Sequence, residues 1–198
     1  MHWPWQRWRQ RRAQADGRFA ACFAPYRGDE WVALDLETTG LDPRVDEILS
    51  IAAVRGDAQR LRLRERLVLT VRSRSHRVAG SSRHHQLRPV DVRNALPVGE
   101  ALEQLLDFVG GRPLVGYVIG FDVAMLDRPL QRLHGFRMPQ RRIDIRDLYR
   151  RWLAARQPDR PGEANLDAIA TELGIPLFER HTALGDAVTA GLAYLRLR

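Results

Sequence analysis

Two acids close an apolar run near the start of the chain. Asp35 and Glu37 stand two positions apart in Trp-Val-Ala-Leu-Asp-Leu-Glu, which begins at Trp31 and leads into a Thr-Thr-Gly turn. The run predicts a buried strand, and residues two apart on a strand project from the same face. Two such carboxylates repel each other unless a cation lies between them, and their hard oxygens suit Mg²⁺ or Mn²⁺. Pairing of either acid with an arginine is the alternative.

Two further acids and a histidine stand at the expected starts of helices. Asp122 follows Gly-Tyr-Val-Ile-Gly-Phe, where a strand leaves the sheet and a helix begins. Near the other end, His181-Thr-Ala-Leu-Gly-Asp186 leads into the last predicted helix. An Asp in a first turn can simply complement the helix dipole, and a histidine before a helix can be structural. The ordinary pKa of a histidine near 6.5 also makes it competent to take a proton near neutral pH.

Short apolar runs and helical periodicity predict the elements that position these side chains. Three successive strands joined by short turns indicate an antiparallel meander, and helices alternating with strands then indicate a mixed α/β sheet flanked by helices. Pro129 is expected to bend or interrupt its helix, and Gly110 and Gly174 to end theirs. We expect strands at 31–36, 48–55, 61–71, 113–117 and 141–145, a loop over 72–97 with one helical turn near 89–94, and helices at 98–109, 121–133, 146–155, 165–173 and 184–195.

The composition fits one globular domain with a basic surface. The chain has 198 residues, a net charge of +8 and a pI near 10.9, and every basic side chain is arginine. Such a charge favours polyanionic partners, either nucleic acid or acidic lipid. Cys22 is the single cysteine, which excludes an intrachain disulfide and a cysteine metal cage. With no run near the roughly 20 apolar residues that cross a bilayer and no secretory signal, we expect a cytoplasmic protein.

Residues 1–28 form a segment rich in Arg, Gln, Ala and Trp, whose composition differs from that of the apolar run beginning at Trp31. We treat it as an appendage to a domain over residues 29–198. A cationic segment with tryptophans can lie on a membrane surface, stack on single-stranded bases or fold back onto the domain. The composition alone leaves these three alternatives open.

Taken in order, the three acidic motifs resemble a known family. Asp-x-Glu-Thr-Thr-Gly, Gly-Phe-Asp and His-x-Ala-x-x-Asp are similar to the exonuclease motifs of the DnaQ-like DEDDh family over roughly residues 31–195. The histidine five positions before Asp186 is typical of the histidine branch, because the position that holds tyrosine in the other branch holds Thr182. The resemblance implies a ribonuclease H-like fold, with a five-stranded sheet whose first three strands are antiparallel.

The resemblance also implies a two-metal site. Asp35, Glu37 and Asp186 would bind the more buried Mg²⁺ or Mn²⁺ ion, Asp35 also the second, and Asp122 the second ion's water shell. Two cations roughly 3.5 to 4 Å apart stabilise the charge on the attacking and leaving oxygens of a phosphodiester. His181 would act as the general base toward the attacking water. The implied function is a metal-dependent 3′-5′ exonuclease on single-stranded or frayed DNA, with RNA also open, that releases nucleoside 5′-monophosphates.

Family analogy further assigns residues to the terminal nucleotide. Thr38, Thr39, Gly40 and Leu41 form the expected receiving turn, with Phe121 and His85 as further contacts. The short stretch after the third motif favours a stand-alone nuclease, and relatives are often homodimers. Many relatives have a His-Asn pair where this chain has Tyr117-Val118. That departure motivates the alternative of a catalytically weak nuclease-fold module that acts as a nucleic-acid-binding or protein-binding scaffold. We expect Asp144 to orient backbone or to pair with an arginine.

Overall fold

A computed structural model describes residues 17–73, 89–160 and 165–198. His85 and the tryptophans of the N-terminal segment lie outside these residues, so the expectations placed on them are not addressed by the structure. The described elements follow one another as α2 (Ala20–Phe23), β1 (Trp31–Thr38), β2 (Ile48–Gly56), β3 (Leu61–Thr70), α4 (Pro89–Arg93), α5 (Val98–Val109), β4 (Leu114–Gly116), α6 (Ile119–His134), β5 (Arg142–Asp144), α7 (Ile145–Ala154), α8 (Leu166–Glu172) and α9 (Ala183–Leu197).

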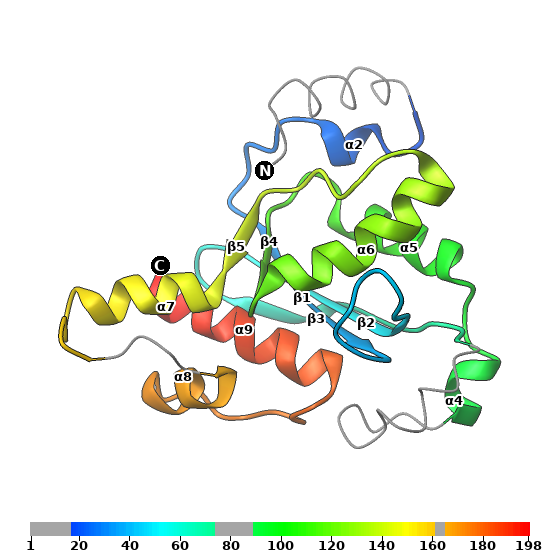
Figure 1. The fold of residues 1–198 in the computed structure, drawn as a ribbon. Helices are drawn as coiled ribbons and strands as arrows, with labels where there is room; N and C mark the ends of the chain where they lie inside the picture. Colours follow the sequence, from blue (N-terminus) through cyan, green and yellow to red (C-terminus); the bar gives the residue numbers. More distant parts are fainter. Residues whose placement is uncertain (1–16, 74–88, 161–164) are drawn as a thin grey trace.

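The five strands form one sheet in the order β3-β2-β1-β4-β5 (Figure 1). β1, β2 and β3 are antiparallel neighbours, and β4 and β5 run parallel to β1. The antiparallel meander and the mixed sheet expected from the sequence are therefore confirmed. β1 is the central strand, and its apolar residues are buried because helices cover both of its faces, as parallel connections require.

Helices cover both faces of the sheet (Figure 1). α5 and α6 pack on one face, where Leu102, Leu106 and Leu126 are fully buried. α7, α8 and α9 cover the other face, and the alanines of α9 bring it close to β1 and β2. A Cβ at Gly191 would lie 2.8 Å from Leu61 Cδ1, so glycine permits this close approach. The described residues include no helix with the length and apolarity to cross a membrane.

Two local details bear on the sequence expectations. α6 is one helix from Ile119 to His134 and continues through Pro129, so the expected interruption is wrong. Its packing explains this, because Met125, Leu126 and Leu130 around the proline are all buried and burial outweighs one lost backbone hydrogen bond. The expected ends at Gly110 and Gly174 are confirmed, and both glycines have positive φ.

The described part of the N-terminal segment packs against the domain. α2 lies in residues 17–28, and Phe19, Cys22 and Phe23 are buried in the same core as α5 and α6. Phe19 and Phe23 contact the ring of Phe136 edge to face. The division into an appendage over residues 1–28 and a domain over residues 29–198 stays a prediction.

Candidate active site

The first two acids extend from one face of β1. Asp35 and Glu37 are both half-buried, whereas Leu36 between them points the other way and is buried in the core beneath α6. Asp35 shares its face with Ala33, over which α9 packs. The period-two expectation is thereby met, and both carboxylates lie on the side of the sheet from which α9 brings the third motif.

Asp122 joins them from the first turn of α6. Its side chain is 4% exposed, and its Oδ1 accepts a hydrogen bond of 3.1 Å from the backbone N–H of Leu36. A buried carboxylate held by the strand that carries the other two acids is fixed in place. Asp144 caps α7 by accepting from the backbone N–H of Arg146, and the same Oδ1 accepts from the N–H of Val118, the residue before α6. Asp144 thus orients backbone, as expected.

The pKa values of all three acids are raised. Burial is the main reason why the pKa of Asp35 lies well above its ordinary value, and the charges of Asp122 and Glu37 raise it further. Burial likewise raises the pKa of Asp122 to about 8 and that of Glu37 to about 7. Buried carboxylates with raised pKa values require either protons or a cation near neutral pH. This cluster is a candidate cation site.

The third motif approaches at the start of α9. Thr182 caps this helix by accepting a 3.1 Å hydrogen bond from the N–H of Gly185, and Asp186 lies half-buried in the first turn. A Cβ at Gly185 would lie 2.3 Å from the carbonyl oxygens of Phe178 and Glu179. Only glycine therefore lets this preceding loop lie against the helix. His181 lies at the end of the loop, exposed to solvent and with a positive φ of 62°.

An arginine that the sequence analysis did not single out stands between these groups. The guanidinium of Arg180 forms ion pairs with Asp186 and with Asp167. Its charge also lowers the pKa of Asp35 and of Glu37 against the effect of burial. Arg180 is one of many arginines in the chain, and only its place next to His181 in the motif could have indicated this role.

The structure brings Asp35, Glu37 and Asp122 within electrostatic range of one another and sets Asp186 against Arg180. In residues 17–73, 89–160 and 165–198, no three His, Cys, Asp or Glu side chains are arranged closely enough to hold a metal ion. Arg180 supplies the positive charge that the acids meet instead. The donor set is nevertheless one of hard carboxylate oxygens with raised pKa values, which fits a hard divalent cation.

Asp46, which the sequence analysis did not identify, stabilises the turn that is predicted to receive the terminal nucleotide. The hydroxyl of Thr39 donates to Asp46 Oδ1 at 2.9 Å and accepts from the N–H of Glu47. Thr38 donates its hydroxyl to the carbonyl oxygen of Gly40. Both threonines are therefore engaged within the turn, and Asp46 is 6% exposed.

The tip of this turn and the neighbouring aromatic ring differ in exposure. Leu41 is 85% exposed, so its side chain extends into solvent from the turn. Phe121 is half-buried and packs against the core beside Asp122. Contact of these residues with a nucleotide stays a prediction.

Comparison with known proteins decides the family. The RNase T family model, described as an exonuclease, matches residues 32–194. This chain belongs to that exonuclease family. The resemblance to DnaQ-like exonucleases is confirmed, since its relatives include DNA polymerase III epsilon-like proteins and oligoribonucleases and its fold neighbours are ribonuclease H-like exonucleases.

Two sequence relatives and one solved structure with a similar fold illustrate the range. The PolC-type DNA polymerase III of Thermotoga petrophila is 31% identical over 167 residues, which are 84% of this chain and 12% of the polymerase. The oligoribonuclease of Dichelobacter nodosus is 34% identical over 137 residues, 61% of this chain and 76% of that enzyme. E. coli exonuclease I in complex with a dT13 oligonucleotide has a TM-score of 0.71 at 18% identity, covering 84% of this chain and 40% of that one. The chain thus spans less than half the length of the polymerase relative and of the exonuclease I structure.

Proposed function

We propose that this chain is a metal-dependent 3′-5′ exonuclease that hydrolyses phosphodiester bonds at the 3′ end of single-stranded or frayed nucleic acid. The observation that carries the proposal is the gathering of Asp35, Glu37 and Asp122 at the end of β1 with raised pKa values. A cluster of this kind is costly to the fold and is typical of a functional site. The exonuclease family supports the same reaction.

In the proposed mechanism the four acids bind metal ions, and one of them also positions the strand. Asp35, Glu37, Asp122 and Asp186 would hold Mg²⁺ or Mn²⁺ ions, which supply stabilisation of the negative charge on the attacking and leaving oxygens. Asp122 also fixes the backbone of β1 through its hydrogen bond to Leu36, so the strand carrying the other acids stays aligned. Hydrolysis at the terminal bond releases a nucleoside 5′-monophosphate.

His181 would take the proton of the attacking water on a ring nitrogen. Its side chain is exposed at the start of α9, and its neighbour Arg180 faces the carboxylates. The exposure of His181 and its place directly after Arg180, which pairs with Asp186, support this role. The turn at Gly40 and Leu41 would contact the last nucleotide.

Two relatives support different substrates for the same site. Exonuclease I of E. coli is described in complex with dT13, which supports single-stranded DNA, and the oligoribonuclease relative supports short RNA. We assign single-stranded DNA first. The alternative of a catalytically weak scaffold rests on Tyr117-Val118, where many relatives have His-Asn.

The test follows the shortening of 5′-labelled strands and the release of mononucleotides from 3′-labelled strands, for single-stranded DNA and RNA with Mg²⁺ or Mn²⁺. The unmodified chain should shorten the strands stepwise from the 3′ end. His181→Ala should lose at least about 100-fold in rate, as is usual when a general base is removed, and Asp35→Ala should lose at least about as much because it removes a metal ligand. Asp159→Ala, which removes an exposed acid outside the cluster, is the control. If none of the four proteins degraded any of the substrates, the proposal would be overturned in favour of the scaffold.

A further inference from the structure

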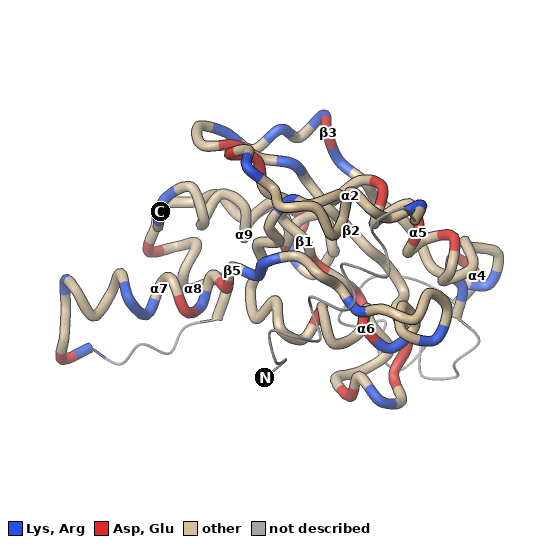
Figure 2. Tube along the Cα trace, turned by 90° about the horizontal axis from the view of Figure 1, so that it is seen from above, with Lys and Arg blue, Asp and Glu red and all other residues tan. Residues whose placement is uncertain are grey.

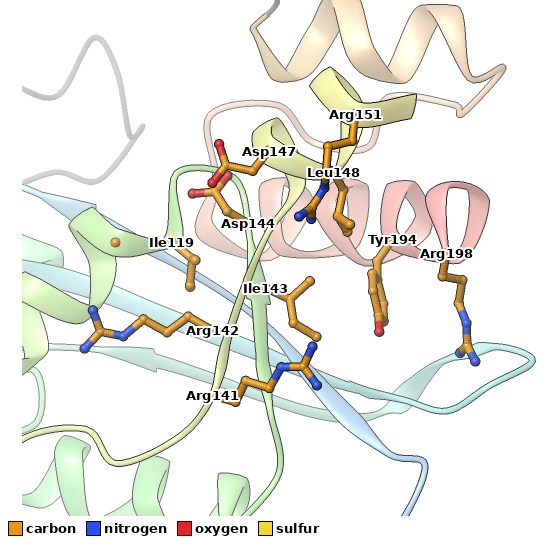
Figure 3. A pocket seen from close by; sticks show the side chains of 11 residues that line it. Ile119, Arg141, Arg142, Ile143, Asp144, Asp147, Leu148, Arg151, Tyr194 and Arg198 are labelled. Carbon is orange, nitrogen blue, oxygen red and sulfur yellow. The ribbon is translucent and has the colours of Figure 1, made fainter. Parts of the chain in front are cut away.

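A cavity of about 530 Å³ lies along the free edge of β5, which is the last strand of the sheet (Figure 3). β5, α7 and the C-terminal part of α9 line it, and this volume falls within the range of about 300 to 1,000 Å³ that ligand sites occupy. Ile143 and Leu148 give it an apolar wall, and the ring of Tyr194 adds an aromatic one. We call this cavity the β5 groove. None of the residues assigned to catalysis lines it.

Two arginines that line the β5 groove have guanidinium groups that form no ion pair with the residues that the structure describes. Arg141 and Arg151 are exposed and form no ion pair within the part of the chain that the structure describes. Figure 3 shows their guanidinium groups above and below the side chain of Ile143. By contrast, Arg142 pairs with Asp127 at 3.8 Å. The carboxylates of Asp144 and Asp147 also line the groove, so Arg141 and Arg151 are the part of its lining that can bind an anion.

The chemistry of the walls selects the kind of anion. A guanidinium presents a planar fork of donors that matches a phosphate. The apolar and aromatic walls suit a planar base, which stacks on a tyrosine ring with little regard to its sequence. Tyr194 is half-exposed, and its ring contacts Trp31 edge to face at 5.0 Å. The guanidinium of Arg198, which also lines the groove, lies over the Tyr194 ring at 5.8 Å from its centroid, so a stacking base would replace this contact. A nucleotide, with phosphate and base, satisfies both parts of the groove.

The β5 groove begins beside the carboxylate cluster. Ile119 and Gly120 line one end, and they open the helix that carries Asp122 in its first turn. Asp144 lies at the same end, because β5 runs parallel to β1 and β4. Arg141 precedes it by three residues, which is about 10 Å along a strand. Figures 1 and 2 both place β5, α7 and the C-terminus on one side of the molecule. The groove therefore leads away from the acids.

We infer that the β5 groove binds a nucleotide unit of the substrate strand several nucleotides from its 3′ end, through a phosphate held by Arg141 and Arg151. This inference rests on the proposed exonuclease function and adds a second contact region to it. Short oligonucleotides that end within the carboxylate cluster do not reach the groove. Binding of longer strands is therefore strengthened by two arginines that short strands never touch.

The test compares Arg141→Gln/Arg151→Gln with Arg64→Gln/Arg132→Gln, which removes the same charge from exposed arginines on β3 and α6. Both pairs are made in the full chain carrying Asp35→Asn, and binding of labelled 3-mer and 12-mer DNA is followed by fluorescence anisotropy. We expect the groove variant to bind the 12-mer at least about ten-fold more weakly than the control, with equal binding of the 3-mer. The dependence of log K on log salt for the 12-mer should flatten by about 0.7 for each lost phosphate contact.

The outcomes separate this inference from the function on which it rests. Equal 12-mer binding by the two variants, with both oligonucleotides bound by the parent chain, overturns the β5 groove site alone. A loss that is the same for 3-mer and 12-mer overturns it as well, because the arginines would then act at the 3′ end. Competition of the 12-mer by free nucleoside monophosphate that disappears in the groove variant would assign the groove to free nucleotide instead of strand. Failure of the parent chain to bind either oligonucleotide counts against the exonuclease function itself.

Discussion

The guanidinium of Arg180 forms an ion pair with the carboxylate of Asp186, the acid that the third motif contributes to the site. The same guanidinium pairs with Asp167 on α8. Both Arg180 and Asp186 are largely withdrawn from water, with side chains 19% and 16% exposed. The chain thus provides its own positive charge at the place where a divalent cation is expected, and the two cations compete for one carboxylate.

Replacing Arg180 by Gln should therefore tighten metal binding. Release of a partly exposed ion pair, worth about 0.2 to 1 kcal/mol, should lower the Kd for Mn²⁺ by up to about five-fold, as measured by titration calorimetry. Arg64→Gln on β3 serves as the control for net charge. Weaker or unchanged Mn²⁺ binding in Arg180→Gln would show that the arginine does not compete with the ion.

The raised pKa values predict how the metal-free protein responds to pH. A carboxyl group whose pKa is higher in the folded than in the unfolded chain stabilises the folded protein at low pH. This contribution is complete below the pKa of the unfolded chain and is lost as the pH rises through the pKa of the folded chain. For Glu37 and Asp122 that window runs from about pH 4 to about 7 and 8. The free energy of unfolding should fall across it by at most about 1.4 kcal/mol per pH unit for each group.

Asp122→Asn tests this dependence because the amide oxygen can still accept from the N–H of Leu36. Melting temperatures in a chelator between pH 5 and 8.5 should fall less steeply in this variant than in the unmodified chain, with the larger gain at pH 8.5. Asp159→Asn, at an exposed position between α7 and α8, should leave the slope unchanged. Parallel curves for all three proteins would contradict the raised pKa of Asp122.

Much of the fold can be predicted from local sequence, and the residues show why. The apolar run of β1 is short and bounded by polar residues, which favours a buried strand. Gly110 and Gly174 end helices because each has a positive φ that glycine adopts without strain. The acids were found because their spacing matches both a strand face and a family motif. Arg180 and Asp46 were not found, although Asp186 and Thr39 lie only six and seven residues away from them, because the local pattern does not distinguish these residues from the other charged residues of the chain. The continuity of α6 through Pro129 depends on packing that no local pattern contains.

Val118 caps α6 with a φ of 52° and a ψ of 36°, a left-handed conformation that costs a β-branched residue about 1 to 3 kcal/mol. Asn tolerates this conformation better, so Val118→Asn should raise the free energy of unfolding by about 1 kcal/mol. For a chain of this size the melting temperature should rise by about 2 to 4 °C. Val45→Asn, an exposed valine without positive φ, should not gain. A lower melting temperature for Val118→Asn would rule out relief of strain at this cap.

Gly185 lets the loop before α9 lie directly on the helix, because a Cβ there would meet two backbone carbonyl oxygens at 2.3 Å. Backbone cannot yield as a flexible side chain does, so Gly185→Ala should cost about 1 to 3 kcal/mol of stability. It should also shift Arg180 and His181, so that exonuclease activity at 10 °C, well below the melting transition, falls at least about ten-fold. Gly99→Ala is the matched control, since that Cβ would lie 3.5 Å from Leu133 Cδ1, an ordinary van der Waals distance. If Gly185→Ala kept the control's activity while both proteins stayed folded, the contact between loop and helix would have no part in placing His181.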